Sequence, residues 1–289
     1  MHVTETFVTM PDGARLFTRI VEPTAAAPAR PTLLIPNGIV YLDDFAPLAA
    51  THRLVSYDLR NRGASDAWPS ASGVLSDVED LERLREALGL GRCATLGHSY
   101  VGVIVALHAM RHPGGVDRVV MIGAPPPDAA ATYPPELAYA DGVLPAAFAR
   151  LGGLHQARGT MEPEAFFRAT WDVLRPIYVA DPANAAKVRW DRAELANERE
   201  FLTYWMATVQ PSLQALRLGP DDYAALTAPV LVVHGRKDRS APLGGARDWA
   251  ARLPSARLLE VPEAAHGPWF EDASVLPAIA AFLGEGRAA

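Results

Sequence analysis

Residues 92–111 read RCATLGHSYVGVIVALHAMR, and this stretch decides how the rest of the chain is interpreted. Its first part is a short apolar run that favours a β-strand, and its last part is a longer apolar run that favours a buried helix. Ser99 stands at the junction, two residues after Gly97. A tight turn between a strand and a helix exposes a serine hydroxyl at the edge of a sheet. The stretch therefore predicts a strand, a turn that carries a nucleophilic serine, and a helix.

The segments on either side repeat the pattern of a short strand followed by a helix. Strands are predicted at 3–10, 14–21, 32–36, 53–57, 92–97, 117–122, 229–234 and 257–261, and helices at 74–88, 99–111, 243–253 and 275–283. The first two strands, joined by Pro11-Asp12-Gly13, are expected to form an antiparallel hairpin. Strands that alternate with helices are typical of a parallel sheet with crossover helices. The predicted fold class is α/β, with a mostly parallel central sheet flanked by helices.

Residues 125–216 interrupt this alternation. They are rich in alanine, proline and aromatic residues and have a helical pattern broken at the prolines. The economical interpretation is a helical cap inserted into a core made of residues 1–124 and 217–289. Most aromatic side chains of the insertion are expected to pack within it, and Trp171, Tyr204 and Trp205 are predicted to contact the substrate.

Composition limits the partners of the chain. The 289 residues carry a net charge of −6, and the basic residues are scattered, so no nucleic-acid partner is expected. The single cysteine, Cys93, excludes an internal disulfide, and no Cys/His cluster has zinc-ligand spacing. We see no signal-peptide pattern and no apolar run near the ~18 residues of a membrane span. The expectation is a cytoplasmic monomer or homodimer with a small-molecule substrate, no membrane partner, no metal and no cofactor.

At this point the chain resembles the α/β-hydrolase superfamily, from about residue 3 to residue 283. The resemblance implies a triad in the order serine, acid, histidine. Residues 234–242, HGRKDRSAP, are similar to the family's acid loop and imply Asp238 as the acid. Residues 262–271, PEAAHGPWFE, are similar to the family's histidine segment and imply His266 as the base. His234 would support the acid loop, whereas the side chain of His98 is expected to point away from Ser99.

The resemblance also implies an oxyanion hole and its support. One donor would be the amide of Tyr100, and the other would come from the loop after strand 32–36. Where the family reads H-G-x, this chain reads Asn37-Gly38-Ile39, so Ile39 is the implied donor. Residues 58–65, DLRNRGAS, resemble a family turn that would buttress this loop, with no catalytic role for Asp58. Gly38 and Trp269 are further predicted substrate contacts.

Two departures from the family pattern bear on the chemistry. Asn37 replaces the usual histidine, and Val101 stands where a small residue is usual, with Gly102 one place later. The primary expectation is a serine hydrolase of the carboxylic ester type. In it His266 takes the Ser99 proton, Asp238 orients His266, and an acyl-enzyme is hydrolysed by water.

Three other functions stay open. A proline iminopeptidase would use acidic cap residues to hold a free amino terminus. The cap offers Glu162, Glu164, Glu194, Glu198 and Glu200. A cofactor-free lyase, acyltransferase or cyclase of secondary metabolism could carry an intact triad, and a ligand-binding protein could retain the fold. A dehalogenase is disfavoured because its nucleophile is an aspartate.

Overall fold

The computed structural model describes residues 2–22, 30–68 and 73–286. In these ranges one sheet contains β1 (His2–Thr9), β2 (Arg15–Glu22), β3 (Thr32–Pro36), β4 (Arg53–Tyr57), β5 (Cys93–His98), β6 (Val116–Ile122), β7 (Val230–Gly235) and β8 (Ala256–Val261). The order across the sheet is β1-β2-β4-β3-β5-β6-β7-β8. β1 with β2 and β2 with β4 are antiparallel, and the pairs from β4 to β8 are parallel. The predicted fold class is confirmed.

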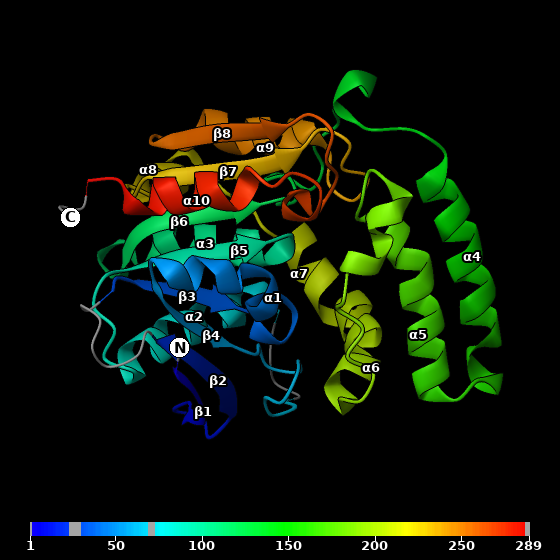
Figure 1. The fold of residues 1–289 in the computed structure, drawn as a ribbon, viewed down its shortest axis with the longest axis horizontal. Helices are drawn as coiled ribbons and strands as arrows, with labels where there is room; N and C mark the ends of the chain where they lie inside the picture. Colours follow the sequence, from blue (N-terminus) through cyan, green and yellow to red (C-terminus); the bar gives the residue numbers. More distant parts are fainter. Residues whose placement is uncertain (1, 23–29, 69–72, 287–289) are drawn as a thin grey trace.

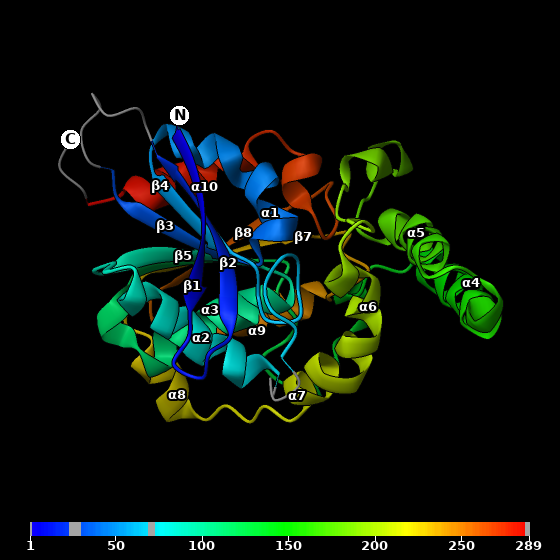
Figure 2. The same cartoon turned by 90° about the horizontal axis from the view of Figure 1, so that it is seen from below.

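Helices cover both faces of the sheet. α1 (Gly38–Phe45) and α10 (Val275–Gly284) lie on one face, and α2 (Val74–Ala87), α3 (Tyr100–Arg111), α8 (Pro220–Ala225) and α9 (Leu243–Arg252) lie on the other (Figures 1 and 2). β5 runs through the middle and is buried along its whole length. A parallel strand covered on both faces needs a nearly continuous apolar sequence, as this strand has. Ser99, which follows β5, is therefore held at the edge of a rigid core.

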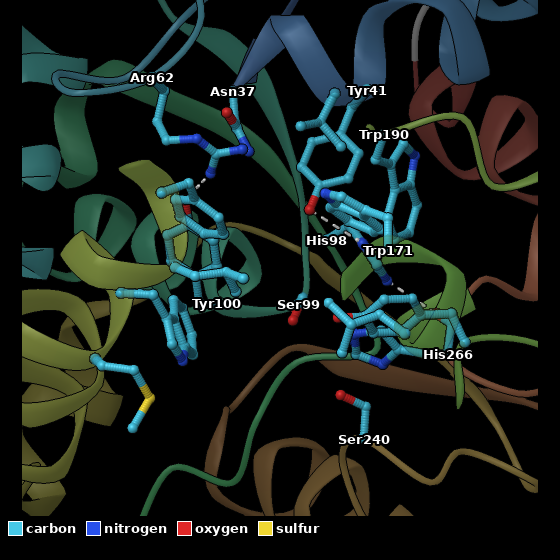
Figure 3. A pocket seen from close by; sticks show the side chains of 17 residues that line it. Asn37, Tyr41, Arg62, His98, Ser99, Tyr100, Trp171, Trp190, Ser240 and His266 are labelled. Carbon is cyan, nitrogen blue, oxygen red and sulfur yellow. Dashed lines mark hydrogen bonds between the residues drawn. The ribbon is translucent and has the colours of Figure 1, made fainter. Parts of the chain in front are cut away.

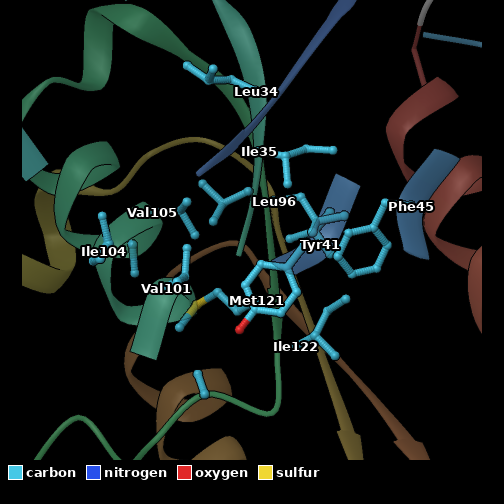
Figure 4. Packing of buried hydrophobic residues seen from close by; sticks show 14 of the residues in the cluster. Leu34, Ile35, Tyr41, Phe45, Leu96, Val101, Ile104, Val105, Met121 and Ile122 are labelled. Atoms are coloured by element: carbon cyan, nitrogen blue, oxygen red, sulfur yellow. The ribbon is translucent and has the colours of Figure 1, made fainter. Parts of the chain in front are cut away.

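The core beneath Ser99 consists of apolar side chains from three strands and one helix. Leu34, Leu96 and Met121 from the sheet and Val105 from α3 pack together with no exposure to solvent (Figure 4). Such close packing holds the end of β5 and the start of α3 in one arrangement.

The chain between β6 and β7 forms a separate group of helices. These are α4 (Val143–Ala157), α5 (Pro163–Leu174), α6 (Ala196–Tyr204) and α7 (Gln210–Gln214). Residues 175–195 connect α5 to α6, and one π-helical turn, Trp205–Val209, continues α6 into α7. α4 and α5 lie outermost, beyond α6, as seen from the sheet (Figures 1 and 2). They bury a small cluster of their own that includes Ala147, Val173 and Ile177. All four helices fall inside the predicted insertion, 125–216.

Every predicted strand is present, and its ends lie within about two residues of the expected ones. Outside the predicted insertion, the structure adds two helices that the sequence did not predict, α1 and α8. α1 begins directly after β3 because Asn37 adopts left-handed backbone angles, φ 63° and ψ 48°, and turns the chain sharply. Within the described ranges, no helix combines the length and the hydrophobicity that crossing a membrane requires.

Candidate active site

Ser99 occupies a strained turn between β5 and α3. Its φ of 56° and ψ of −132° are uncommon for a residue with a side chain. The Ser99 amide donates to the carbonyl of Ile122 at the end of β6, at 2.8 Å, and this bond fixes the turn against the sheet. The Ser99 side chain is directed into a pocket above the sheet edge (Figure 3). The turn has the shape that exposes a nucleophile.

The glycine before Ser99 allows the helix to approach the strand. A Cβ atom added to Gly97 would lie 2.3 Å from the carbonyl oxygen of Val101, so no side chain fits there. Val101 itself presents only backbone to Gly97, and its side chain is fully buried in the core (Figure 4). A valine is therefore accommodated at a position where the family usually has a small residue. Gly102 faces Ala124, where an added Cβ would lie 3.1 Å from the alanine Cβ.

Asp238 and His266 meet at the carboxyl ends of β7 and β8. The Nδ1 of His266 donates to Oδ2 of Asp238 at 2.8 Å, and both residues are buried. Oδ1 of Asp238 accepts the amides of Ser240 at 2.7 Å and Ala241 at 2.9 Å. Burial alone would raise the pKa of Asp238, but the charge and hydrogen bond of His266 hold it below its ordinary value. An ionised Asp238 keeps the proton of His266 on Nδ1 and leaves Nε2 free to accept a proton.

Two neighbouring histidines support this pair. His234 Nε2 donates to the carbonyl of Ala241 at 3.1 Å and lies 3.4 Å from Oδ2 of Asp238, as expected for a support of the acid loop. His98 Nε2 donates to the carbonyl of His266 at 2.9 Å, and the hydroxyl of Tyr41 donates to His98 Nδ1 at 3.2 Å. Burial lowers the pKa of His98 well below its ordinary value, so the ring stays neutral.

Sequence reasoning missed the support that His98 gives to His266. The two residues are far apart in the chain, and no local pattern indicates that their loops meet. The ring of Tyr178, from the segment between β6 and β7, stacks on His266, with ring centroids 5.2 Å apart and an interplanar angle of 26°. His266 is thus positioned by its backbone, by Asp238 and by an aromatic ring.

Ser99 and His266 line the same pocket, whose volume is about 300 Å³ (Figure 3). No hydrogen bond joins the two side chains in the described part of the chain, and such bonds are often long before substrate binds. The helical segment supplies much of the apolar wall: Trp171, Leu174, Tyr178, Trp190, Phe201 and Trp205. An apolar substrate group would therefore be held between the sheet edge and these helices.

Two of the five predicted substrate contacts, Trp171 and Trp205, line the pocket, and three do not. Gly38 is packed against Ser56, whose Oγ would lie 2.6 Å from an added Cβ. Trp269 is packed on Phe45, with ring centroids 5.0 Å apart. Tyr204 packs against the buried core instead, and burial raises the pKa of its hydroxyl to about 12.

The structure also corrects one predicted oxyanion donor. The amide of Ile39 donates to Oδ1 of Asp58 at 2.7 Å, so it is not available to a substrate. The left-handed turn at Asn37 starts α1 directly after β3, and the amide of Ile39, in the first turn of this helix, points toward Asp58. Oδ2 of Asp58 also accepts the amide of Ala64 at 2.9 Å. Asp58 thereby buttresses the loop, as expected. The amide of Tyr100 has no hydrogen-bond acceptor among the described residues and begins α3 beside Ser99.

Apart from the two histidines, His98 and His266, Arg62 is the one acidic or basic residue among the described residues that line the pocket. Its guanidinium is paired with Glu198 of α6, with Nε–Oε1 and Nη2–Oε2 distances of 2.9 Å each. None of the five acidic residues considered for binding an amino terminus lines the pocket. Glu198 forms a salt bridge with Arg62, and Glu164 forms one with Arg168. The pocket therefore offers no carboxylate to an ammonium group.

Comparisons with known proteins agree with this architecture. A family model described as alpha/beta hydrolase fold matches residues 36–273. "Putative carbamate hydrolase RutD" of Variovorax paradoxus (strain S110) is 26% identical over 236 residues, 80% of each chain. The 2-hydroxymuconate semialdehyde hydrolase of Pseudomonas putida is 25% identical over 227 residues, 77% of this chain and 73% of that protein. The structure of the esterase EaEST from Exiguobacterium antarcticum has a TM-score of 0.73 at 17% identity, covering 98% of this chain and 100% of that one.

Proposed function

The chain belongs to the alpha/beta hydrolase fold family, and from this premise we propose that it is a serine hydrolase that cleaves a carboxylic ester of a small molecule. The observation that carries the proposal is the strained backbone of Ser99 in a pocket shared with His266, which is itself bonded to Asp238. A strained serine between a strand and a helix is costly to maintain and is found where a nucleophile must be exposed.

The proposed reaction has two stages. Nε2 of His266 accepts the Ser99 proton while Oγ attacks the ester carbonyl, and Asp238 stabilises the imidazolium that forms. His266 then gives the proton to the departing alcohol, and the acyl group remains on Ser99. In the second stage His266 takes a proton from water, and the hydroxide attacks the acyl carbonyl. The bond to Ser99 Oγ then breaks, His266 returns the proton to Oγ, and the acid is released. The amide of Tyr100 is the proposed donor to the oxyanion.

The substrate is proposed to be mainly apolar and to carry no ammonium group. Residues 125–216 are proposed to act as the cap, because their aromatic side chains form the wall opposite the sheet. The absence of a carboxylate among the residues lining the pocket argues against the iminopeptidase alternative. The names of the relatives, a carbamate hydrolase and a semialdehyde hydrolase, agree with a small organic substrate.

The test is labelling by a fluorophosphonate probe, which reacts with activated serines, together with hydrolysis of 4-nitrophenyl esters. We expect the wild type to be labelled and Ser99→Ala to lose labelling, with kcat reduced by about 10⁴- to 10⁶-fold. Ser240→Ala is the matched control, because Ser240 lines the same pocket and has no proposed nucleophilic role. Labelling that persists in Ser99→Ala, or an unlabelled wild type, contradicts the proposal.

A further inference from the structure

Six aromatic rings of the pocket wall fall into two groups. One group surrounds Tyr178, whose ring is stacked on His266, and we call it the His266 cluster: Trp171, Tyr178 and Trp190. The other group surrounds Trp205, whose ring centroid lies 5.1 Å from that of Tyr100, and we call it the Tyr100 cluster: Tyr100, Phe201 and Trp205. All six residues line the pocket. Among the described residues, no ring contact joins one cluster to the other.

Ser99 lies between the two clusters. Figure 3 shows Trp171 on the same side of Ser99 as His266, and Tyr100 on the opposite side. Each cluster is fixed to the core by contacts of its own. The amide of Gly267 donates to the carbonyl of Tyr178 at 3.1 Å, next to His266 in the chain. On the other side, the guanidinium of Arg62 lies over the ring of Phe201, 3.6 Å from its centroid. Two separate walls therefore stand on either side of the nucleophile before a substrate binds.

The proposed chemistry decides which part of an ester meets each wall. His266 gives its proton to the departing alcohol oxygen, so this oxygen must come within about 3 Å of Nε2. The alcohol group therefore extends along the His266 cluster. The carbonyl oxygen turns to the amide of Tyr100, the proposed oxyanion donor, and the acyl chain leaves the carbonyl carbon in the direction away from the alcohol. The Tyr100 cluster is the wall on that side.

The two sides differ in their exposure to solvent. Trp171 and Trp190 are only 7% and 4% exposed, so the wall on the His266 side is buried and built of flat rings. On the other side Met206, the neighbour of Trp205 in the chain, also lines the pocket and is 63% exposed. A group bound by the His266 cluster is therefore limited in size, whereas a chain bound by the Tyr100 cluster can continue past Met206 toward solvent.

We propose that the His266 cluster binds the alcohol group of the substrate and that the Tyr100 cluster binds its acyl chain. Trp171 and Trp205 are then the residues that determine specificity on the two sides. The inference rests on the proposed esterase function and names its substrate class, an ester of a compact aromatic alcohol with an extended apolar acid. An aromatic alcohol is preferred to a saturated ring of the same size because rings attract one another in edge-to-face and offset arrangements.

The first measurement compares the butyrate esters of benzyl alcohol and cyclohexylmethanol. Both esters release a primary alcohol and form the same butyryl-enzyme, so their kcat/KM values differ through binding of the alcohol group and its departure. We expect kcat/KM for the benzyl ester to exceed that for the cyclohexylmethyl ester by about 2- to 10-fold, the effect of contacts between rings.

The second measurement varies the acid in 4-nitrophenyl esters, in which the leaving group stays the same. We expect kcat/KM for the hexanoate to exceed that for the acetate by about 10-fold or more, because the additional methylene groups are partly buried against the Tyr100 cluster.

Two matched variants each remove one indole from the pocket. Trp171→Leu is expected to bring the benzyl/cyclohexylmethyl ratio close to one and to leave the hexanoate/acetate ratio unchanged. Trp205→Leu is expected to lower the hexanoate/acetate ratio by about 3-fold or more and to keep the alcohol preference. Trp171→Phe retains a ring and is expected to retain the alcohol preference as well. Each ratio compares two esters on one enzyme preparation, so the fraction of folded protein cancels.

The outcomes separate the two proposals. If no ester is hydrolysed and Ser99 is not labelled by the fluorophosphonate, the esterase proposal fails. If esters are hydrolysed but the wild type does not prefer the benzyl ester, or Trp171→Leu keeps that preference, the assignment of the two sides alone is overturned. Loss of the alcohol preference in Trp205→Leu overturns it as well, and this result and the wild-type ratios are decisive even if Trp171→Leu does not fold.

Discussion

At the scale of single residues, the pKa values of two carboxyl groups, those of Asp238 and Asp44, are shifted in opposite directions. His266 holds the pKa of Asp238 below its ordinary value, as the proposed chemistry requires. Asp44, on α1, accepts the indole N–H of Trp190 at 3.0 Å and forms no salt bridge with a described residue. Burial raises the pKa of Asp44 to about 6. The ionised form of Asp44 therefore costs stability at neutral pH.

Asp44→Asn is expected to stabilise the protein at pH 7, because the amide oxygen can still accept from Trp190 without a buried charge. A shift of about two pKa units corresponds to about 2–3 kcal/mol, and partial exposure reduces this to about 1–2 kcal/mol. The folded pKa lies above the unfolded value, so the cost is present above pH 6 and disappears as pH falls toward 4.

Urea unfolding of the wild type and Asp44→Asn at pH 7 and pH 5 measures this effect. The advantage of the variant should be smaller at pH 5 than at pH 7. An equal difference at the two pH values would show that the Asp44 charge is not the cause.

At the scale of elements, the contact between β5 and α3 sets the position of Ser99. Gly97→Ala would place a Cβ 2.3 Å from the carbonyl oxygen of Val101, so the strand and the helix must move apart. We expect a loss of about 1–3 kcal/mol in the free energy of unfolding. We also expect a loss of the proposed esterase activity, because Ser99 shifts out of its position.

Gly91→Ala is the control for this substitution, because nothing lies within 4 Å of a Cβ at Gly91. The free energy of unfolding and the kcat of both variants would be compared with those of the wild type. An active Gly97→Ala enzyme of unchanged stability would show that the close contact does not fix the turn.

The sequence predicted the elements of the core well because its parallel strands are buried and therefore apolar, and because prolines and glycines mark their ends. The sequence did not predict where a group points when that depends on the backbone conformation of a single residue. Nothing in the pattern shows that Asn37 turns left-handed, yet that turn takes the amide of Ile39 out of the site. It also could not pair Arg62 with Glu198, since side chains 136 residues apart meet only through the tertiary fold.

At the scale of the whole molecule, Glu271 joins the insertion to the loop that carries His266. Its Oε1 accepts the amides of Ala180 at 2.8 Å and Asp181 at 3.0 Å, and its Oε2 accepts the amide of Ala265 at 2.8 Å. One carboxylate thus satisfies backbone donors from the segment between β6 and β7 and from the residue before the base. The segment between β6 and β7, the proposed cap, is thereby fixed to the loop that carries His266.

Glu271→Ala is expected to leave these amides without an acceptor and to reduce the free energy of unfolding by about 1–3 kcal/mol. It should also lower kcat, because the His266 loop loses its anchor. Glu263→Ala is the control. Glu263 lies on the same loop but is exposed and paired only with Lys237, so its removal should cost less than about 1 kcal/mol. Equal effects of the two substitutions on unfolding and on kcat would contradict the role of Glu271.

The aromatic wall has a spectroscopic consequence. Three of the six tryptophans, Trp171, Trp190 and Trp205, line the pocket, and the rings of Trp171 and Trp190 lie 6.1 Å apart. Indole emission depends on the polarity around the ring, so a ligand that displaces water from this pocket should shift the emission to shorter wavelength. A titration of inactive Ser99→Ala with an ester should therefore give a saturable fluorescence change, and a spectrum that stays constant while the ester binds by calorimetry would contradict this. The protein carries its own optical reporter of occupancy, and candidate ligands can be screened by fluorescence without any turnover.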